Sequence, residues 1–208
     1  VGDVFTAAIG SDTGVGTTDT PFLRIDSALA VATANDTILI DAGTYYPVDT
    51  ITIETDGMKL IGKDSASTII DFNDTTVTNQ KALYAANRQN LTIRDLQIIK
   101  GRQGLWLNNV DNSTIQMVRT ESNGQHGVFL AAGSDSNSIL NVTSSGNLAD
   151  GIRLDASSGN DLASNASTGN ANDGLSLTAA SGANRITGNR SSGSLNLGVL
   201  VSGSNGNI

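Results

Sequence analysis

One column of residues in this chain combines ionisable side chains with even spacing, and it could support acid–base chemistry. Each member stands just before a Gly or Ala that recurs every 22 to 24 residues: Lys81, Gln103, His126, Asp150 and Asp173. If neighbouring members lie on adjacent strands, about 4.8 Å apart, Asp150 is close enough to raise the pKa of the His126 imidazole. A base, an acid and a cationic group together suit proton abstraction next to a carboxylate. We therefore take His126, Asp150, Lys81 and Arg153 as candidate catalytic residues, with the alternative that His126 is only a surface residue.

A second column, two residues past the same Gly or Ala, is rich in aromatic side chains. Its members are Tyr84, Trp106, Phe129, Arg153, Ser176 and Leu200. Because side chains alternate across a strand, all of them face outward if the residues on either side face inward. The row of Tyr84, Trp106 and Phe129 could bind stacked sugar rings, with Arg153 meeting a carboxylate or sulfate at its end. We favour the alternative that the rings stack on one another, each pair stabilising the joint between strands by about 0.5–1.5 kcal/mol.

These columns belong to an internal repeat of 23 or 24 residues. Five glycines open the pattern Gly, apolar, variable, apolar: Gly104, Gly127, Gly151, Gly174 and Gly198. Five asparagines keep nearly the same rhythm: Asn112, Asn137, Asn160, Asn184 and Asn207. A third series consists of Asn123, Asn147 and Asn170, with Ser194 in the next place. Apolar residues alternate over three or four positions between Gly, Ser and Asn, which predicts short strands joined by tight turns rather than helices.

Each repeat is predicted to form one coil of a solenoid, because a short strand cannot bury its apolar face alone. Stacked coils let the inward residues share one core, and we expect two inward rows. The first is Leu105, Val128, Ile152, Leu175 and Val199, and the second is Leu107, Leu130, Leu154, Leu177 and Val201. An inward asparagine at a bend can hydrogen-bond the coils above and below, and asparagine tolerates the left-handed backbone that a bend requires. We therefore assign the repeated asparagines and glycines a structural role.

The first third of the chain is less regular and is predicted to close the solenoid. Thr20 is expected to cap a short helix that has Pro21 at its first position. One face of this helix carries the apolar residues Phe22, Ile25, Leu29 and Ala32. Strands are expected over residues 37–41, 51–54, 58–61, 68–72 and 82–85. The predicted division is a capping segment over residues 1–36 and a β-helix over residues 37–208, with regular coils from about residue 82.

The repeat resembles the right-handed parallel β-helix superfamily, which includes pectate lyases, alginate epimerases and many bacterial surface proteins. The resemblance rests on the glycine and asparagine series and on an entry segment from Gly16 to Tyr46, and it covers nearly the whole chain. It implies an all-β fold, a right-handed parallel β-helix of about seven or eight coils with an N-terminal helical cap. Alginate epimerases and related lyases of this fold use Tyr, His, Lys and Arg side chains for proton abstraction, although no contiguous match to their catalytic motif surrounds His126.

Composition narrows the classes of function. The 208 residues carry a net charge of -8 with dispersed Lys and Arg, so the basic surface that nucleic acids require is missing. The chain has no cysteine and one histidine, which excludes disulfides and most soft-metal sites. No cofactor is expected, with calcium left as an alternative because Asp135, Asp155 and Asp161 fall in predicted turns without calcium-loop spacing. No apolar run approaches about 18 residues, so no membrane span is predicted.

Two classes of function follow from these features. The preferred prediction is a non-catalytic structural or adhesive protein, secreted or on the cell surface, because the repeat is regular and weakly charged. Residues 205–208 stand where another coil would begin, so we expect this end to stack on more solenoid from the same chain or from another subunit, as in a filament. The alternative is a polysaccharide lyase or uronate epimerase, or a carbohydrate-binding module, with the sugar chain along Tyr84, Trp106 and Phe129.

Overall fold

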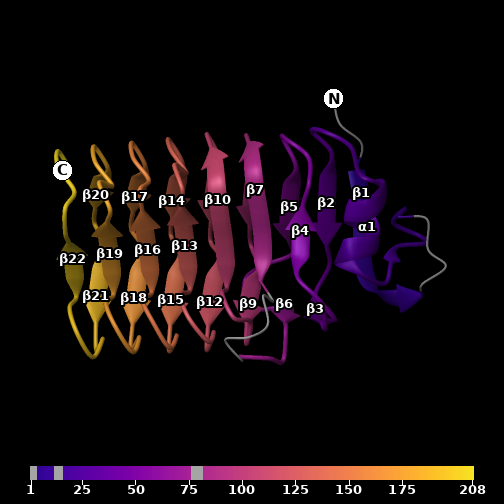
Figure 1. Ribbon diagram of the computed structural model, residues 1–208. Coiled ribbons are helices and arrows are strands. Elements are labelled where there is room, and N and C mark those ends of the chain that lie inside the picture. The colour runs from indigo at the N-terminus through magenta and orange to yellow at the C-terminus, as the bar shows by residue number, and fades with distance from the viewer. Residues whose placement is uncertain (1–3, 12–15, 76–81) are drawn as a thin grey trace.

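The computed structural model describes residues 4–11, 16–75 and 82–208, and within them the chain winds as a parallel β-solenoid of about seven coils (Figure 1). Each coil contributes one strand to each of three sheets, and the strands pair in parallel with those of the coils before and after. This confirms the predicted all-β solenoid.

The three sheets run the length of the solenoid. In order, sheet A holds β1 (Val4–Ser11), β2 (Thr37–Ile40), β5 (Lys59–Gly62), β8 (Thr92–Arg94), β11 (Thr114–Gln116), β14 (Ser138–Leu140), β17 (Asp161–Ala163) and β20 (Arg185–Thr187). Sheet B holds β3 (Gly43–Tyr45), β6 (Thr68–Asp71), β9 (Gln97–Ile99), β12 (Arg119–Glu121), β15 (Thr143–Ser145), β18 (Ala166–Thr168) and β21 (Arg190–Ser192). Sheet C holds β4 (Ile51–Ile53), β7 (Leu83–Gln89), β10 (Leu105–Asp111), β13 (Val128–Ala131), β16 (Ile152–Asp155), β19 (Leu175–Thr178) and β22 (Val199–Val201).

The helix α1 (Ile25–Val31) lies at the N-terminal end of the solenoid, as predicted, but it begins later than expected. Its N-cap residue is Arg24 rather than Thr20, because Phe22 first forms a parallel bridge with Ala7 of β1 and is held extended. The strand β1 was also not predicted from the sequence. It lies within residues 1–36, the segment assigned to the cap, and it pairs with β2, which follows that segment. Among the described residues, no helix has the length and apolar character that a membrane crossing requires.

The two predicted inward rows form the core of sheet C. Val128 lies beside Ile152 in register, and both side chains are buried. The rows stay buried from Leu105 and Leu107 to Leu175 and Leu177. Because β22 is the outermost strand of its sheet, Val199 and Val201 are half exposed, at the end opposite α1 (Figure 1).

The repeated asparagines form hydrogen-bonded ladders inside the bends. Asn160 Oδ1 accepts the backbone N–H of Asn137 at 2.8 Å, and Asn184 Oδ1 accepts that of Asn160 at 2.8 Å. Asn207 continues this ladder by accepting the N–H of Asn184. A second ladder joins Asn123, Asn147 and Asn170, and a third, which the sequence analysis missed, joins Asn165 and Asn189.

The assignment of Asn112 to a ladder is wrong. Asn112 is exposed, and its neighbour Ser113 occupies the ladder position and donates its N–H to Asn137. Asn112 instead has a φ of 52°, in the left-handed region. In the following coils the same left-handed place is held by Ser136 and Gly159, each just before a ladder asparagine. The residue before the ladder therefore makes the left-handed bend, and the asparagine itself supplies the inward hydrogen bond.

The glycines that precede the sheet C strands leave room for a buried row of hydroxyl groups. A Cβ atom on Gly127 would lie 1.9 Å from Ser144 Oγ, and one on Gly151 would lie 1.9 Å from Ser167 Oγ. Each of these hydroxyls donates to a carbonyl oxygen at the same corner: Ser144 to Gly151 and Ser167 to Gly174. At Gly198, next to the outermost strand, the nearest atom to such a Cβ is 3.7 Å away. Close approach of the next coil therefore requires these glycines.

Candidate functional site

The aromatic column lies on the outward face of sheet C. The parallel register places Trp106 between Tyr84 and Phe129 on adjacent strands. The centroid of the Trp106 ring lies 4.8 Å from that of Tyr84 and 6.1 Å from that of Phe129. Trp106 and Phe129 are stacked, with 18° between their ring planes. The Tyr84 ring is tilted by 52° against that of Trp106. All three rings are half-buried, so only part of each ring is left for a ligand.

Arg153 extends this row by one coil. Its guanidinium lies 5.9 Å from the centroid of Phe129, within the range of a cation–π contact. The same group forms an ion pair with Asp155 at 2.8 Å and lies 3.5 Å from Asp150. Two carboxylates of the chain thus already surround the cation that was expected to meet an acidic sugar.

The ionisable column is a hydrogen-bonded ladder on the turns between sheets B and C. Gln103 Oε1 accepts the backbone N–H of His126 at 3.0 Å. His126 Nδ1 in turn accepts the N–H of Asp150 at 3.1 Å, and Asp150 Oδ1 accepts that of Asp173 at 3.0 Å. Asp173 Oδ1 ends the ladder with the N–H of Leu197. Hydrogen-bond acceptors at four successive coils, from Gln103 to Asp173, were the signal in the sequence for such a ladder, whereas the prediction treated this column as acids and bases.

Burial sets the charge state of His126. The side chain keeps 14 % of its surface exposed, and desolvation lowers the pKa of His126 from 6.5 to about 4, although Asp150 alone would raise it. Asp150 does act to raise this pKa, as expected, but the cost of burying a charged ring exceeds that attraction and the net shift is downward. Since Nδ1 accepts a hydrogen bond, the neutral imidazole carries its proton on Nε2. The ring can donate from Nε2, but it is a weak base at neutral pH.

The structure brings together only part of the predicted catalytic set. His126, Asp150 and Arg153 meet on two adjacent coils, with 3.4 Å between His126 Nδ1 and Asp150 Oδ2. Lys81 lies outside the described residues. Tyr84 lies on β7, two strands away from the β13 coil of His126.

The aspartates considered for calcium all have protein partners. Asp135 Oδ1 accepts the N–H of Ser158, Asp155 pairs with Arg153, and Asp161 pairs with Arg185 at 3.1 Å. In the part of the chain that the structure describes, no three His, Cys, Asp or Glu side chains are grouped so that they could hold a metal ion.

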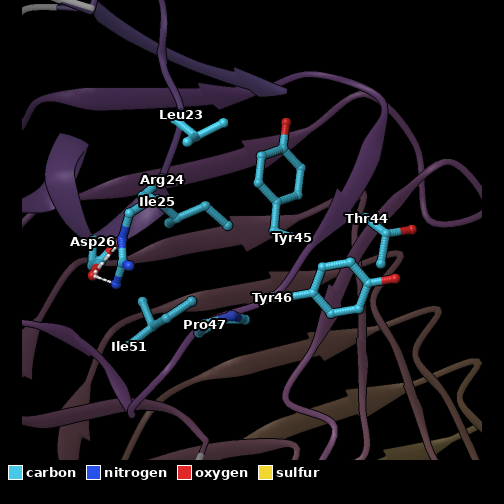
Figure 2. A pocket seen from close by; sticks show the side chains of 9 residues that line it. All are labelled: Leu23, Arg24, Ile25, Asp26, Thr44, Tyr45, Tyr46, Pro47 and Ile51. Atoms are coloured by element: carbon cyan, nitrogen blue, oxygen red, sulfur yellow. Dashed lines mark hydrogen bonds and ion pairs between the residues drawn. The ribbon is translucent and has the colours of Figure 1, made fainter. Parts of the chain in front are cut away.

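A hollow that the sequence analysis did not single out lies at the N-terminal end of the solenoid. It has a volume of about 460 Å³, between the start of α1, the strand β3 and the turn that leads into β4 (Figure 2). Its wall is formed by Leu23, Arg24, Ile25, Asp26, Thr44, Tyr45, Tyr46, Pro47 and Ile51. Only the tertiary fold brings the helix to this corner, so no sequence pattern marks the hollow.

Comparisons with known proteins agree with the fold. Residues 4–207 match the family described as "Pel9A-like, right handed beta helix region". A pectate lyase, PEL9 of Emericella nidulans, is 30 % identical over 161 residues, which are 70 % of this chain and 39 % of that protein. The chain therefore spans well under half the length of this relative.

Solved structures share the fold at low sequence identity. A rhamnogalacturonan lyase superposes with a TM-score of 0.77 at 17 % identity, over 99 % of this chain and 63 % of that one. The catalytic domain of a GH87 alpha-1,3-glucanase, in complex with nigerose, gives a TM-score of 0.72 at 20 % identity, over 98 % of this chain and 37 % of that one. Pectate lyase Pel9A gives a TM-score of 0.54 at 18 % identity, over 91 % of this chain and 47 % of that one.

Proposed function

This chain belongs to the family of Pel9A-like right-handed β-helix proteins, and we propose that it binds and cleaves a uronate-containing polysaccharide by β-elimination. The family match over residues 4–207 carries the proposal. The relatives named as pectate lyase and rhamnogalacturonan lyase support the same class of substrate. These similarities favour the lyase alternative over the non-catalytic structural role that the sequence analysis preferred.

The outward face of sheet C is the proposed site of binding. The half-buried row of Tyr84, Trp106 and Phe129 offers apolar ring edges along the direction in which the coils stack. His126 and Arg153 stand beside this row, and the His126 ring centroid is 5.1 Å from that of Phe129. A polysaccharide lying along the row would pass beside His126 and Arg153.

In β-elimination a base removes the proton next to the uronate carboxylate, a C4–C5 double bond forms, and the C4–O bond breaks with its electrons on the leaving oxygen. That oxygen then requires a proton. The neutral imidazole of His126 is a poor base because its pKa is about 4, and it would have to become an imidazolate to give up its Nε2 proton. It suits a hydrogen bond from Nε2–H to the charge that develops on the leaving oxygen, while the proton for that oxygen comes from solvent water. We assign His126 the role of hydrogen-bond donor to the leaving oxygen, and we propose Lys81, one of the catalytic candidates from the sequence, as the base.

A location outside the cell follows from the proposed substrate, since such polysaccharides belong to the cell wall. End-to-end association through β20, β21 and β22 is a second proposal, favoured by the half-exposed Val199 and Val201 on the outermost strand. Light scattering that shows particles larger than a 21.3 kDa monomer would support it, and a monomer at high concentration would contradict it.

The lyase proposal is tested by incubating the protein with polygalacturonate or rhamnogalacturonan and measuring the ultraviolet absorbance of the unsaturated uronates that are released. We expect His126→Gln to lower the turnover number by about 100-fold, because the amide oxygen can keep the Asp150 N–H bond while the ring donor is lost. Gln103 holds the neighbouring ladder position in this way and shows that the residue type fits. Binding without product would indicate a binding module, and neither binding nor product would overturn the proposal.

A further inference from the structure

We propose that the hollow beside α1 is a second carbohydrate site, which binds one uncharged pyranose unit. The proposal rests on the proposed function only for the class of ligand, because none of the nine lining residues belongs to the aromatic row or to the His126 ladder. The volume of about 460 Å³ falls within the roughly 300–1,000 Å³ of small-molecule sites.

One wall of the hollow is a surface ion pair. Arg24 Nε donates to Asp26 Oδ1 at 2.9 Å, and a second bond joins Arg24 Nη2 to Asp26 Oδ2. The two side chains keep 37 % and 46 % of their surfaces exposed. The hydrogen bond from Arg24 lowers the pKa of Asp26, so the carboxylate stays ionised as an acceptor. The pair therefore presents N–H donors and carboxylate lone pairs side by side, and adjacent sugar hydroxyls, which both donate and accept, complement it.

The opposite wall is aromatic. Figure 2 shows the rings of Tyr45 and Tyr46 on the far side of the hollow from the Arg24–Asp26 pair, with Ile25, Pro47 and Ile51 lining the space between. Tyr45 is fixed, because its hydroxyl lies 3.0 Å from the carbonyl oxygens of both Ala7 and Asp41. Tyr46 is 68 % exposed, so its ring face is accessible to a sugar. An aromatic face on one side and paired polar groups on the other match the two kinds of surface that a pyranose ring presents.

Charge selects an uncharged sugar over a uronate. The carboxylate of Asp26 meets the guanidinium of Arg24, so the two charges that line the hollow sum to zero. The hollow thus differs in specificity from the polyuronate surface proposed for sheet C.

Ligand-detected NMR titration with methyl galactoside and with galacturonate tests the site. The unmodified protein should bind the galactoside more tightly than the galacturonate. Tyr46→Ala should weaken galactoside binding about tenfold through loss of the ring face. Asp26→Asn should narrow the preference for the galactoside over galacturonate, because it removes a negative charge from the wall of the hollow. Val48→Ala is the matched control: Val48 lies in the same turn, is 66 % exposed and does not line the hollow, so binding should not change.

The outcomes separate this inference from the lyase proposal. Equal binding of the galactoside by the unmodified protein and Tyr46→Ala, or tighter binding of galacturonate by the unmodified protein, would overturn the second site. Loss of galactoside binding in Tyr46→Ala with unchanged release of unsaturated products from polygalacturonate would support it. If no product is released and the galactoside preference still depends on Tyr46 and Asp26, the lyase proposal fails while the second site stands.

Discussion

The early and late coils of this solenoid use the same inward column of sheet B in opposite ways. In the early coils the column consists of apolar or aromatic residues: Tyr45, Ile70 and Ile98. From β12 onward it consists of hydroxyl residues: Thr120, Ser144, Ser167 and Ser191. Thr120 and Ser144 hydrogen-bond to each other at 3.0 Å, and both are fully buried. The first coils are therefore held at this corner by apolar burial, and the later ones by buried hydrogen bonds that need glycine beside them.

The contrast shows that the polar corner is stabilised by partners from neighbouring coils, and that in the described part of the chain Ser191 Oγ, on the outermost strand of sheet B, is the member of the hydroxyl column left without one. The amide nitrogen of Asn147 donates to Ser144 Oγ and to Asn170 Oδ1, each at 2.9 Å. An unpaired group at such a site would cost about 1–3 kcal/mol. Because each coil supplies the partner for the next, the polar corner is stable only as a continuous ladder.

The largest expected effect comes from the apolar half of the column. Ile98→Ala should lower the free energy of unfolding by about 4 kcal/mol, because it opens a cavity in a fully buried site. Ser144→Ala, at the same place two coils later, should cost only about 1–2 kcal/mol, since it removes hydrogen bonds and leaves no large void. Denaturant unfolding followed by circular dichroism measures both. Equal losses would mean that the two halves are held in the same way.

The glycines of the polar half give the next largest effect. Gly151→Ala should destabilise the protein by about 3 kcal/mol, because its Cβ would lie 1.9 Å from Ser167 Oγ. Gly198→Ala, at the equivalent place beside the outermost strand, has 3.7 Å of clearance and should change stability by less than about 0.5 kcal/mol. Thermal unfolding of both variants compares them directly. A harmless Gly151→Ala would show that the hydroxyl row can move aside.

The ladder itself is tested by exchanging one of its members. Asn147→Ala should cost about 2 kcal/mol, since it leaves the buried N–H of Asn123 without an acceptor. Asn112→Gly should be nearly neutral, because Asn112 is exposed in a left-handed bend that glycine adopts freely. Hydrogen exchange of the Asn123 amide provides a local readout. A large loss in Asn112→Gly would return Asn112 to the ladder and contradict the corrected assignment.

The smallest expected effect is the pH dependence of the free energy of unfolding that arises from His126 in the outward ladder. Its pKa is lower in the folded protein, at about 4, than its ordinary value of 6.5, so folding favours the neutral ring. The stability that this provides is complete above about pH 6.5 and is lost as the pH falls toward 4. We expect about 1–2 kcal/mol less stability at about pH 5 than at pH 7, and His126→Gln should remove this part of the slope. Parallel pH profiles of the two proteins would contradict the buried, neutral histidine.

Regular spacing allowed much of this molecule to be predicted. The register of Val128 with Ile152 and the outward row of Tyr84, Trp106 and Phe129 follow from a repeat of 23 or 24 residues and from the alternation of a strand. The start of α1 was missed because it depends on the bridge between Phe22 and Ala7, two residues that are far apart in the chain. Asn112 was misassigned because it is the asparagine nearest to the ladder position, which Ser113 occupies; its spacing of 25 residues from Asn137, outside the repeat of 23 or 24, marked the mismatch.

The repeat alone settles which side chains stand in a column, because parallel coils in register place residues one period apart next to each other. It leaves open what each column does. Three features depend on burial and on contacts between distant segments. They are the lowered pKa of His126, the ion pairs of Arg153 with Asp150 and Asp155, and the hollow between α1 and the turn before β4. Desolvation and the distances between partners are set by the tertiary structure. Only the folded coil therefore determines whether an ionisable side chain hydrogen-bonds to the backbone or is free to contact a ligand.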